Sequence, residues 1–190
     1  ELRRNRLEGK RYTSREFAEL EFEHMWTKVW LLLGRESEMQ EPGDWQREDV
    51  GTESILMVRQ DDKTIKAFYN ICQHRGNQLL QEEKGHAKRL VCKYHAWAFA
   101  IDGALLFAQD AKNFSQGNPC DNVRLKEIRC ETFAGFIWVN MDPECAGLKK
   151  SLGPIWDDWS KYDLHTWKRY MAITTTLPCN WKVVMDNFNE

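Results

Sequence analysis

Apolar residues in the first part of the chain recur at mixed helical spacing. They are Phe17, Leu20, Met25, Trp26, Val29 and Trp30. The segment Thr13-Ser14-Arg15-Glu16 fits a capping box, with Thr13 as the N-cap and Glu16 reaching back to it. This pattern predicts an amphipathic helix from about Ser14 to about Trp30, preceded by a basic, extended arm over residues 1–12.

From about Glu38 the pattern changes to short apolar and aromatic runs separated by Gly and Asp. The runs are Ser54–Arg59, Thr64–Ile71, Arg89–Cys92, Trp97–Ile101, Ala104–Phe107 and Ala134–Asn140. Asp102-Gly103 between two of them is typical of a hairpin turn. The sequence therefore predicts an antiparallel β domain that ends near residue 143.

The last part of the chain alternates between helical and extended patterns. Residues 144–168 read as a connector with one or two short helices, which Leu152, Ile155, Trp156, Trp159 and Leu164 line by core packing. Tyr170–Leu177 is rich in β-forming residues, and Asn180–Glu190 begins a helical segment. The expected fold class is mainly β with flanking helices, divided into 1–37 (arm and helix), 38–143 (β domain) and 144–190 (connector and the start of an α+β domain).

Composition narrows the range of functions. The 190 residues include 27 Lys and Arg against 29 Asp and Glu, a net charge of −2, which is too balanced for binding nucleic acid or a membrane surface through a basic field. The apolar runs are too short to span a membrane. No secretory leader is visible, although the chain starts at Glu1, which suggests a trimmed N-terminus. A cytoplasmic location is expected, and the six cysteines read as reduced thiols or metal ligands.

Two short motifs bring Cys and His together. Cys72-Gln73-His74 is followed, after 17 residues, by Cys92-Lys93-Tyr94-His95. Two such loops can close on a two-iron cluster, with both Cys on one iron and both His on the other, at a potential of about −150 to +300 mV. Structural zinc bound by the same four side chains is an alternative. A second alternative is that the motifs arise by chance and contain only buried thiols and hydrogen-bonded histidines. Zinc motifs usually pair Cys with Cys and His with His, so the mixed halves favour a 2Fe–2S cluster.

The segments Cys72–Gly76 and Cys92–Trp97 resemble the Rieske domain of ring-hydroxylating oxygenase α subunits, the Rieske non-haem iron oxygenases. Weaker resemblances lie in the expected order at Pro42–Trp45, Phe68–Ile71 and Gly135–Asn140, and the likeness runs from about Tyr12 to Glu190. The chain departs from the family at Ala96, where a glycine is usual. Ala is tolerated at a negative φ, so we expect little loss there.

The resemblance implies an oxygenase that takes electrons from a ferredoxin or reductase and passes them through the 2Fe–2S cluster to a mononuclear Fe(II). That Fe(II) would activate O2 to hydroxylate an aromatic or other small hydrophobic substrate, as in aromatic hydrocarbon catabolism. No His follows His165, so the Fe(II) ligands would lie beyond this chain. The family implies a homotrimer or an α3β3 assembly. The alternative is a stand-alone Rieske ferredoxin, which needs neither the N-terminal helix nor the Asn180–Glu190 segment. A zinc-stabilised interaction domain is a weaker reading.

The resemblance also assigns roles to single residues. Glu190 would be the bridging acid, accepting hydrogen bonds from an iron-ligand His and from His95 of the partner subunit, and Asn187 would lie near the iron. The alternative for Glu190 is a solvated carboxylate on a helix surface, and the alternative for Asn187 is an amide in a turn or on the surface. Trp97 and Tyr94 would shield the cluster or pack in the core. Arg75 would contact the bridging partner or pair with an acid. The other cysteines are expected to be inert thiols, and the other histidines are expected to have no metal role: Cys120, Cys130, Cys145, Cys179, His24, His86 and His165.

Overall fold

The computed structural model of the protein describes residues 8–189. They form two compact units, of which the larger is Val29–Trp167. The smaller joins the described residues of Glu1–Lys28 and Lys168–Glu190. Within residues 8–189, no helix is long and apolar enough to cross a lipid bilayer. The domain limits expected after residues 37 and 143 stay predictions.

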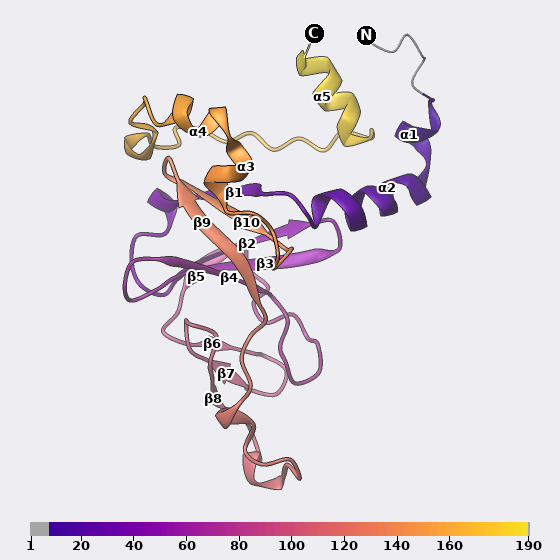
Figure 1. Ribbon diagram of the computed structural model, residues 1–190. Helices are drawn as coiled ribbons and strands as arrows, with labels where there is room; N and C mark the ends of the chain where they lie inside the picture. The colour runs from indigo at the N-terminus through magenta and orange to yellow at the C-terminus, as the bar shows by residue number, and fades with distance from the viewer. Residues whose placement is uncertain (1–7, 190) are drawn as a thin grey trace. The chain divides into compact units, whose positions relative to one another are not determined.

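The larger unit is built on an antiparallel sheet in the strand order β1-β10-β9-β4-β3-β2-β5 (Figure 1). Its strands are β1 Leu31–Arg35, β2 Asp44–Val50, β3 Glu53–Arg59, β4 Ile65–Tyr69, β5 Lys84–His86, β9 Glu127–Phe133 and β10 Phe136–Asn140. The interior strand β3 contains a continuous apolar run, Ile55–Val58, that is fully buried. Such a run is typical of a strand covered on both faces.

A second, smaller sheet lies at the end of this unit opposite to helices α3 (Leu148–Leu152) and α4 (Pro154–Trp159) (Figure 1). Its strands are β6 Leu90–Val91, β7 Ala98–Phe99 and β8 Leu105–Phe107. The predicted Asp102-Gly103 hairpin is confirmed, since Ala100 N donates to Ala104 O at 2.8 Å. Gly103 has φ +90°, and a Cβ there would lie 2.7 Å from the Phe68 ring, so the turn requires glycine.

Two clusters of buried side chains form the core of the larger unit. One lies beneath the small sheet and contains Phe68, Leu90 and Phe99 together with both motif cysteines, Cys72 and Cys92. The other cluster contains Met39, Ile55, Met57, Ile65, Ala67, Ile128, Ile137 and Val139. Burying each large apolar side chain stabilises the fold by about 1.5–3 kcal/mol, so the motif loops rest on a rigid base.

The expected short helices of the connector are α3 and α4. Trp156 in α4 stacks on Phe133 of β9 with ring centroids 3.6 Å apart. The connector ends in the single 3-10 turn Leu164–Thr166. There the buried Arg35 donates from Nη2 to the carbonyl oxygens of Leu164 at 2.8 Å and Trp167 at 2.7 Å. Arg35 therefore fixes the point where the chain leaves this unit.

The smaller unit contains α1 Lys10–Thr13, α2 Arg15–Glu21, a π-helical turn Phe22–Trp26 and α5 Trp181–Asn189. The predicted N-cap was wrong. Thr13 ends α1, and the extended Ser14 caps α2, its Oγ accepting from Phe17 N at 3.1 Å. The helix also stops at Trp26 rather than Trp30. The basic arm is helical from Lys10 onward, and residues 1–7 lie outside the described range.

The helices of the smaller unit are joined by a half-buried ion pair. Lys182 Nζ in α5 lies 2.8 Å from each carboxylate oxygen of Glu21 in α2. The same ammonium lies 5.2–5.7 Å from the ring centroids of Tyr12, Phe17 and Trp181. Aromatic faces attract a cation, so this cage holds α5 against the N-terminal helices.

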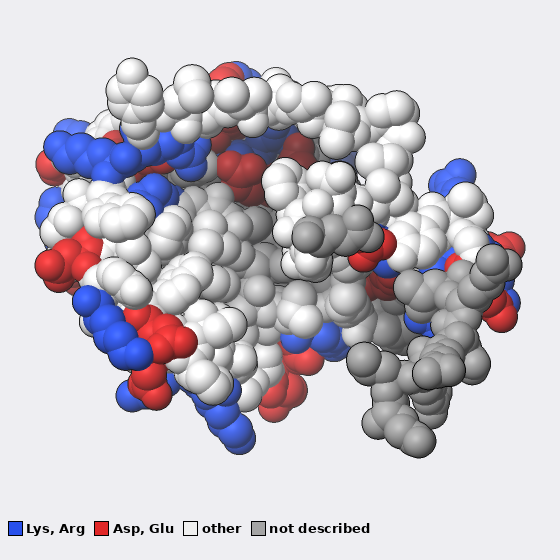
Figure 2. Space-filling model, turned by 90° about the horizontal axis from the view of Figure 1, so that it is seen from above, with Lys and Arg blue, Asp and Glu red and all other residues white. Residues whose placement is uncertain are grey.

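The strand predictions were incomplete. The apolar runs did not include β1, β2, β5 and β9, although the resemblance at Pro42–Trp45 marked the start of β2. Tyr170–Leu177, which is rich in β-forming residues, is irregular and exposed in the structure. On the face shown in Figure 2, Lys and Arg side chains alternate with Asp and Glu, and neither sign forms one continuous field. This distribution matches the near-neutral net charge of −2.

Candidate metal centre

The first motif forms a closed loop, Cys72–Asn77, soon after β4. Cys72 N donates to Asn77 O at 2.8 Å, and Gly76 N donates back to Cys72 O at 3.0 Å. Gly76 has φ +68°, in the left-handed region that glycine adopts readily. These two hydrogen bonds bring the ends of the loop together and fix the backbone that carries Cys72 and His74.

The second motif, Cys92–Trp97, repeats this backbone geometry. Cys92 N donates to Trp97 O at 2.8 Å, and Ala96 N donates to Cys92 O at 3.0 Å. Ala96 therefore occupies the position that Gly76 has in the first loop, and its φ is +56°. The expectation that Ala96 keeps a negative φ was wrong, because the loop needs a left-handed residue four positions after its cysteine.

The first loop is anchored to the sheet by Asn70, which is fully buried. Its side-chain Nδ2 donates to Leu80 O at 2.7 Å, and Leu80 N donates to its Oδ1 at 2.9 Å. Its backbone N donates to Ser54 O at 2.8 Å. Asn70 thus joins the two ends of the 70–80 segment by a pair of hydrogen bonds, as backbone groups of paired strands do. It thereby holds the ligand loop at the end of β4.

The two motif cysteines form a buried pair of thiols. Cys72 is 1% exposed and Cys92 is 2% exposed. Burial raises the pKa of Cys72 to about 11, and the hydrogen bond that it shares with the Cys92 thiol contributes to the rise. A bound cation would instead favour the thiolate, which is the metal-binding form.

The two motif histidines are also adjacent. Their ring centroids lie 4.8 Å apart in an edge-to-face arrangement. Burial, followed by the nearby His95 and Arg75, lowers the pKa of His74, which favours the neutral imidazole that binds metals. His95 Nδ1 is buried and has no hydrogen-bond partner among the described residues. A buried polar atom left unpaired costs about 1–3 kcal/mol, so this nitrogen has the character of a ligand atom.

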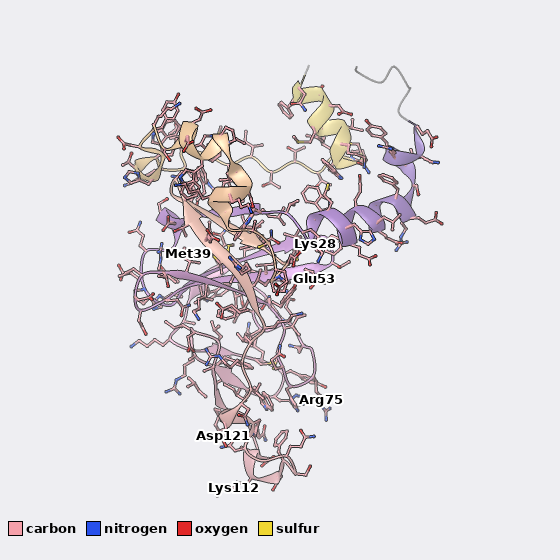
Figure 3. The ribbon with its side chains drawn as sticks, viewed as in Figure 1. Lys28, Met39, Glu53, Arg75, Lys112 and Asp121 are labelled. Atoms are coloured by element: carbon pink, nitrogen blue, oxygen red, sulfur yellow. The ribbon has the colours of Figure 1, made fainter. Side chains whose placement is uncertain are left out.

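Aromatic side chains frame the two imidazoles. Trp97, 3% exposed, stacks on His74 with ring centroids 4.7 Å apart and planes 10° from parallel. Tyr94 is largely exposed, and its ring centroid lies 3.8 Å from that of His95. Both imidazoles line an open hollow of about 470 Å³ with residues that include Arg75, Trp97 and Phe114. The Arg75 side chain projects outward from its loop at this end of the unit (Figure 3).

This donor set fits a 2Fe–2S cluster of the kind in which two histidines replace two cysteines on one iron. Such a cluster takes its protein ligands as one thiolate pair and one imidazole pair, and the loops supply both pairs. The orphaned His95 Nδ1 lies among them. Within residues 8–189, no group of three or more His, Cys, Asp or Glu side chains could hold a single metal ion, whereas each iron of a 2Fe–2S cluster takes only two protein ligands.

The other predicted site residues lie elsewhere. Asn187 belongs to α5 in the smaller unit, where the neighbouring Asp186 accepts a hydrogen bond from Tyr12 Oη at 2.8 Å. Glu190 lies outside the described residues, so its role stays a prediction. The sequence analysis missed Asn70 and Asn77. Asn70 was visible only as a polar residue inside the apolar run Thr64–Ile71, and Asn77 as the residue after the left-handed glycine.

Comparisons with known proteins extend beyond the two loops. The protein-family model described as "Rieske [2Fe-2S] domain" matches residues 29–124. The oxygenase subunit of carnitine monooxygenase from Escherichia coli (strain K12) is 37% identical over 182 residues, which cover 94% of this chain and 48% of that protein. The alpha subunit of benzene 1,2-dioxygenase from Pseudomonas putida is 33% identical over 192 residues, covering 96% of this chain and 42% of that protein.

Solved structures agree with these relatives. A quaternary ammonium Rieske monooxygenase in complex with γ-butyrobetaine has a TM-score of 0.88 at 31% identity, over 95% of this chain and 52% of that one. A mutant of naphthalene 1,2-dioxygenase bound to phenanthrene has a TM-score of 0.70 at 33% identity, over 75% of this chain and 32% of that one. The chain spans about half the length of the curated relatives it matches, 48% and 42% in the two cases above. Its fold, its paired loops and the family match over residues 29–124 establish that the chain belongs to the Rieske [2Fe–2S] domain family, whose cofactor is a 2Fe–2S cluster.

Proposed function

We propose that this chain is the cluster-bearing part of the oxygenase α subunit of a Rieske non-haem iron oxygenase. In this proposal Cys72 and Cys92 hold one iron, and His74 and His95 hold the other. The observation that carries the assignment is the buried thiol pair beside an imidazole pair in which His95 Nδ1 has no protein partner in residues 8–189. When bound, the cluster supplies reversible one-electron transfer, at a potential of about −150 to +300 mV.

Different residues surround the two ends of the proposed cluster, the thiol side at Cys72 and Cys92 and the imidazole side at His74 and His95. The thiol side is enclosed by the core that contains Phe68, Leu90 and Phe99, which keeps water from the sulfur atoms. The imidazole side faces the open hollow, so an electron partner can approach it there. Trp97 stacks on the His74 ring and fixes its plane. We propose that Tyr94 shields the His95 edge and that Arg75 contacts the partner.

The oxygenase role is supported by the extent of the likeness. Curated oxygenase subunits match 94–96% of this chain, which includes residues on both sides of the Rieske-domain match over 29–124. A stand-alone Rieske ferredoxin would not explain the matched residues outside that range. The Fe(II) site, of the 2-His-1-carboxylate type with positions open for O2, would be completed by protein outside this chain. A ferredoxin or reductase donor and a homotrimeric or α3β3 assembly complete the proposal.

The substrate class depends on residues outside this chain. The aromatic substrate expected from the sequence is supported by the 33% identity to the benzene 1,2-dioxygenase subunit. The 37% identity to the carnitine monooxygenase subunit favours a second candidate, a small quaternary ammonium compound. Both candidates belong in the first activity screen. The expected cytoplasmic location stays a prediction.

Two further assignments complete the proposed electron route. Glu190 would accept hydrogen bonds from an Fe(II)-ligand His and from His95 of the partner subunit, since an ionised carboxylate can hold two N–H donors at once. Asn187 would lie near that iron. In the full-length protein, Glu190→Gln should leave the cluster's EPR signal intact while product formation falls. Normal product formation in that variant would remove Glu190 from the route.

The first experiment measures metal content. We expect two irons and two acid-labile sulfides per chain, with a low-average-g EPR signal after dithionite reduction. Cys72→Ser should abolish this signal, whereas the exposed Cys179→Ser serves as the matched control and should retain it. One zinc and no sulfide in the wild-type protein would overturn the cluster assignment.

The second experiment measures oxygenase activity of the full-length protein. With an electron donor and O2, we expect oxygen consumption and a hydroxylated product with either benzene or carnitine as substrate. A protein whose cluster is reduced and reoxidised without any substrate-dependent oxygen consumption would instead be an electron carrier.

A further inference from the structure

Asn77 and Trp97 occupy equivalent positions in the two ligand loops. Each is the fifth residue after its cysteine, and each closes its own loop by accepting a hydrogen bond from that cysteine's backbone N at 2.8 Å. Their side chains reach in opposite directions, across to the other loop. Trp97 stacks on His74 of the first loop, and Asn77 approaches Cys92 of the second loop.

The Asn77 amide is oriented by the residue that follows the first loop. Nδ2 donates to Gln78 O at 2.7 Å and to Cys92 Sγ at 3.9 Å. A primary amide nitrogen carries two hydrogens, so one can serve the carbonyl while the other points at the sulfur. The Asn77 side chain is half-buried, which limits competition from water for this donor.

The acceptor changes in character when the cluster is bound. Cys92 then carries a thiolate, and hydrogen bonds to a charged acceptor are roughly twice as strong as those between neutral groups. Reduction adds a further negative charge to the centre. A fixed N–H donor beside the sulfur therefore stabilises the reduced state more than the oxidised state, and hydrogen bonds to the sulfurs are among the factors that set such potentials.

We propose that Asn77 is a positioning residue of the first loop that donates a hydrogen bond to the Cys92 thiolate of the second loop and raises the reduction potential of the cluster. This inference rests on the cluster ligands proposed above and is independent of the oxygenase activity. Asn77 thus links the loops in two ways, through its backbone to Cys72 and through its side chain to Cys92.

The test compares midpoint potentials by redox titration followed by EPR, on full-length cluster-loaded protein at one pH and one ionic strength. Asn77→Leu keeps the branching of the side chain at Cγ and removes the donor. We expect electron affinity to fall by up to about tenfold, which is 59 mV for a one-electron couple. The matched control is Gln78→Met, because the neighbouring Gln78 amide donates to Ser54 Oγ at 3.4 Å and, within residues 8–189, makes no hydrogen bond to Cys92. The control should leave the potential unchanged.

A second variant keeps the proposal testable if Asn77→Leu loads poorly. Asn77→Gln retains an amide donor on a longer stem, so it should hold more iron and sulfide than Asn77→Leu and keep a potential closer to the wild type. An unchanged potential in loaded Asn77→Leu overturns the proposal. So does equal loss of cluster in the Leu and Gln variants, which would indicate a packing role alone. A wild-type protein without a cluster would refute the proposed function instead.

Discussion

At the scale of single residues, the two ligand loops have the same backbone conformation but different residues at the position where that conformation is left-handed. The loops share the same pair of hydrogen bonds, yet one places Gly76 and the other Ala96 at the left-handed position. A left-handed conformation costs an L-residue with a Cβ about 1–2 kcal/mol. The cost at Ala96 is therefore local strain in the loop that carries Cys92 and His95.

Ala96→Gly should stabilise the protein by up to about 1 kcal/mol, because the relief of strain exceeds the added freedom of the unfolded chain. Urea unfolding at equal cluster content measures the change. Gly76→Ala is the matched control, since φ is +68° and no atom lies within 4 Å of the Cβ it would add. It should lose a similar amount. A lower unfolding midpoint for Ala96→Gly would contradict the prediction.

The site could be predicted from sequence only where chemistry and spacing are local. The four candidate ligands lie within 24 residues, so their types and order were enough to predict a cluster. The supporting residues could not be found in this way. Asn70 acts through Leu80, and Asn77 acts on Cys92, and neither contact follows from a pattern of residue types. The φ of Ala96 was likewise invisible without the hydrogen bonds of its loop.

At the scale of elements, predicted strands were right where apolar runs are buried on both faces, as in β3. The apolar runs did not reveal β2 and β9, because both strands carry charged residues on partly exposed faces. These two strands form because each lies between two other strands of the sheet. Tyr170–Leu177 shows the converse. Its residues favour strands, but a strand needs a neighbour to pair its backbone, and this segment pairs with none of the described strands.

Asn70 joins β4 to the first ligand loop, so its replacement should affect both the fold and the cluster. Asn70→Leu removes two hydrogen bonds with Leu80 and leaves a buried donor and acceptor unpaired, at about 1–3 kcal/mol for each group. We expect a lower unfolding midpoint and reduced iron content. Gln73→Ala, an exposed change in the same loop, is the control. Wild-type iron content in Asn70→Leu would show that the loop holds without this anchor.

Asp44 in β2, whose carboxylate lies 2.9 Å from His86 Nδ1 in the edge strand β5, should make stability depend on acid pH. Burial alone would raise the pKa of Asp44, but hydrogen bonds from the Glu41 amide, His86 and the Gln40 amide outweigh it and lower the pKa below its ordinary 3.8. A lowered folded-state pKa contributes stability that is complete above the unfolded value and is lost as pH falls through the folded value. This contribution should therefore disappear below about pH 4.

The test is the difference in unfolding free energy between the wild type and Asp44→Asn, both cluster-loaded. At pH 5 Asp44 is ionised and its contribution to the difference is complete, and the difference should shrink as the pH is lowered from 5 to below 4. Measuring a difference removes the acid sensitivity of the cluster, which both proteins share. A difference that grows in acid would contradict the assigned sign.

At the scale of the whole molecule, the structure consists of two units, and the chain between the last turn of one and α5 of the other is irregular. Arg35 fixes the exit from the larger unit at Trp167. Immediately afterwards Lys168, Arg169 and the fully exposed Tyr170 leave any regular structure. Exposed irregular segments are preferred sites of proteolysis.

Limited trypsin digestion of this chain should therefore cut first after Lys168 or Arg169. The strand arginines should resist, since Arg59 is 7% exposed and donates to Met39 O at 2.7 Å. Intact-mass measurement identifies the cut, and the visible spectrum reports whether the cluster stays in the fragment. An initial cut within the sheet would show that the larger unit opens more readily than the linking segment.

The core beneath the ligand loops also sets the order of events during synthesis. All four candidate ligands have been made by residue 95, yet the core that encloses both thiols includes Leu125, whose backbone N bonds Gly103 O at 2.8 Å. Ribosomes add roughly 5–20 residues per second, so the nascent chain displays its ligands for a few seconds before this core can close. Because the core encloses the thiols only after Leu125 has been made, we expect iron to be inserted after translation of Leu125. The time at which the cluster forms would then depend on a residue outside both loops.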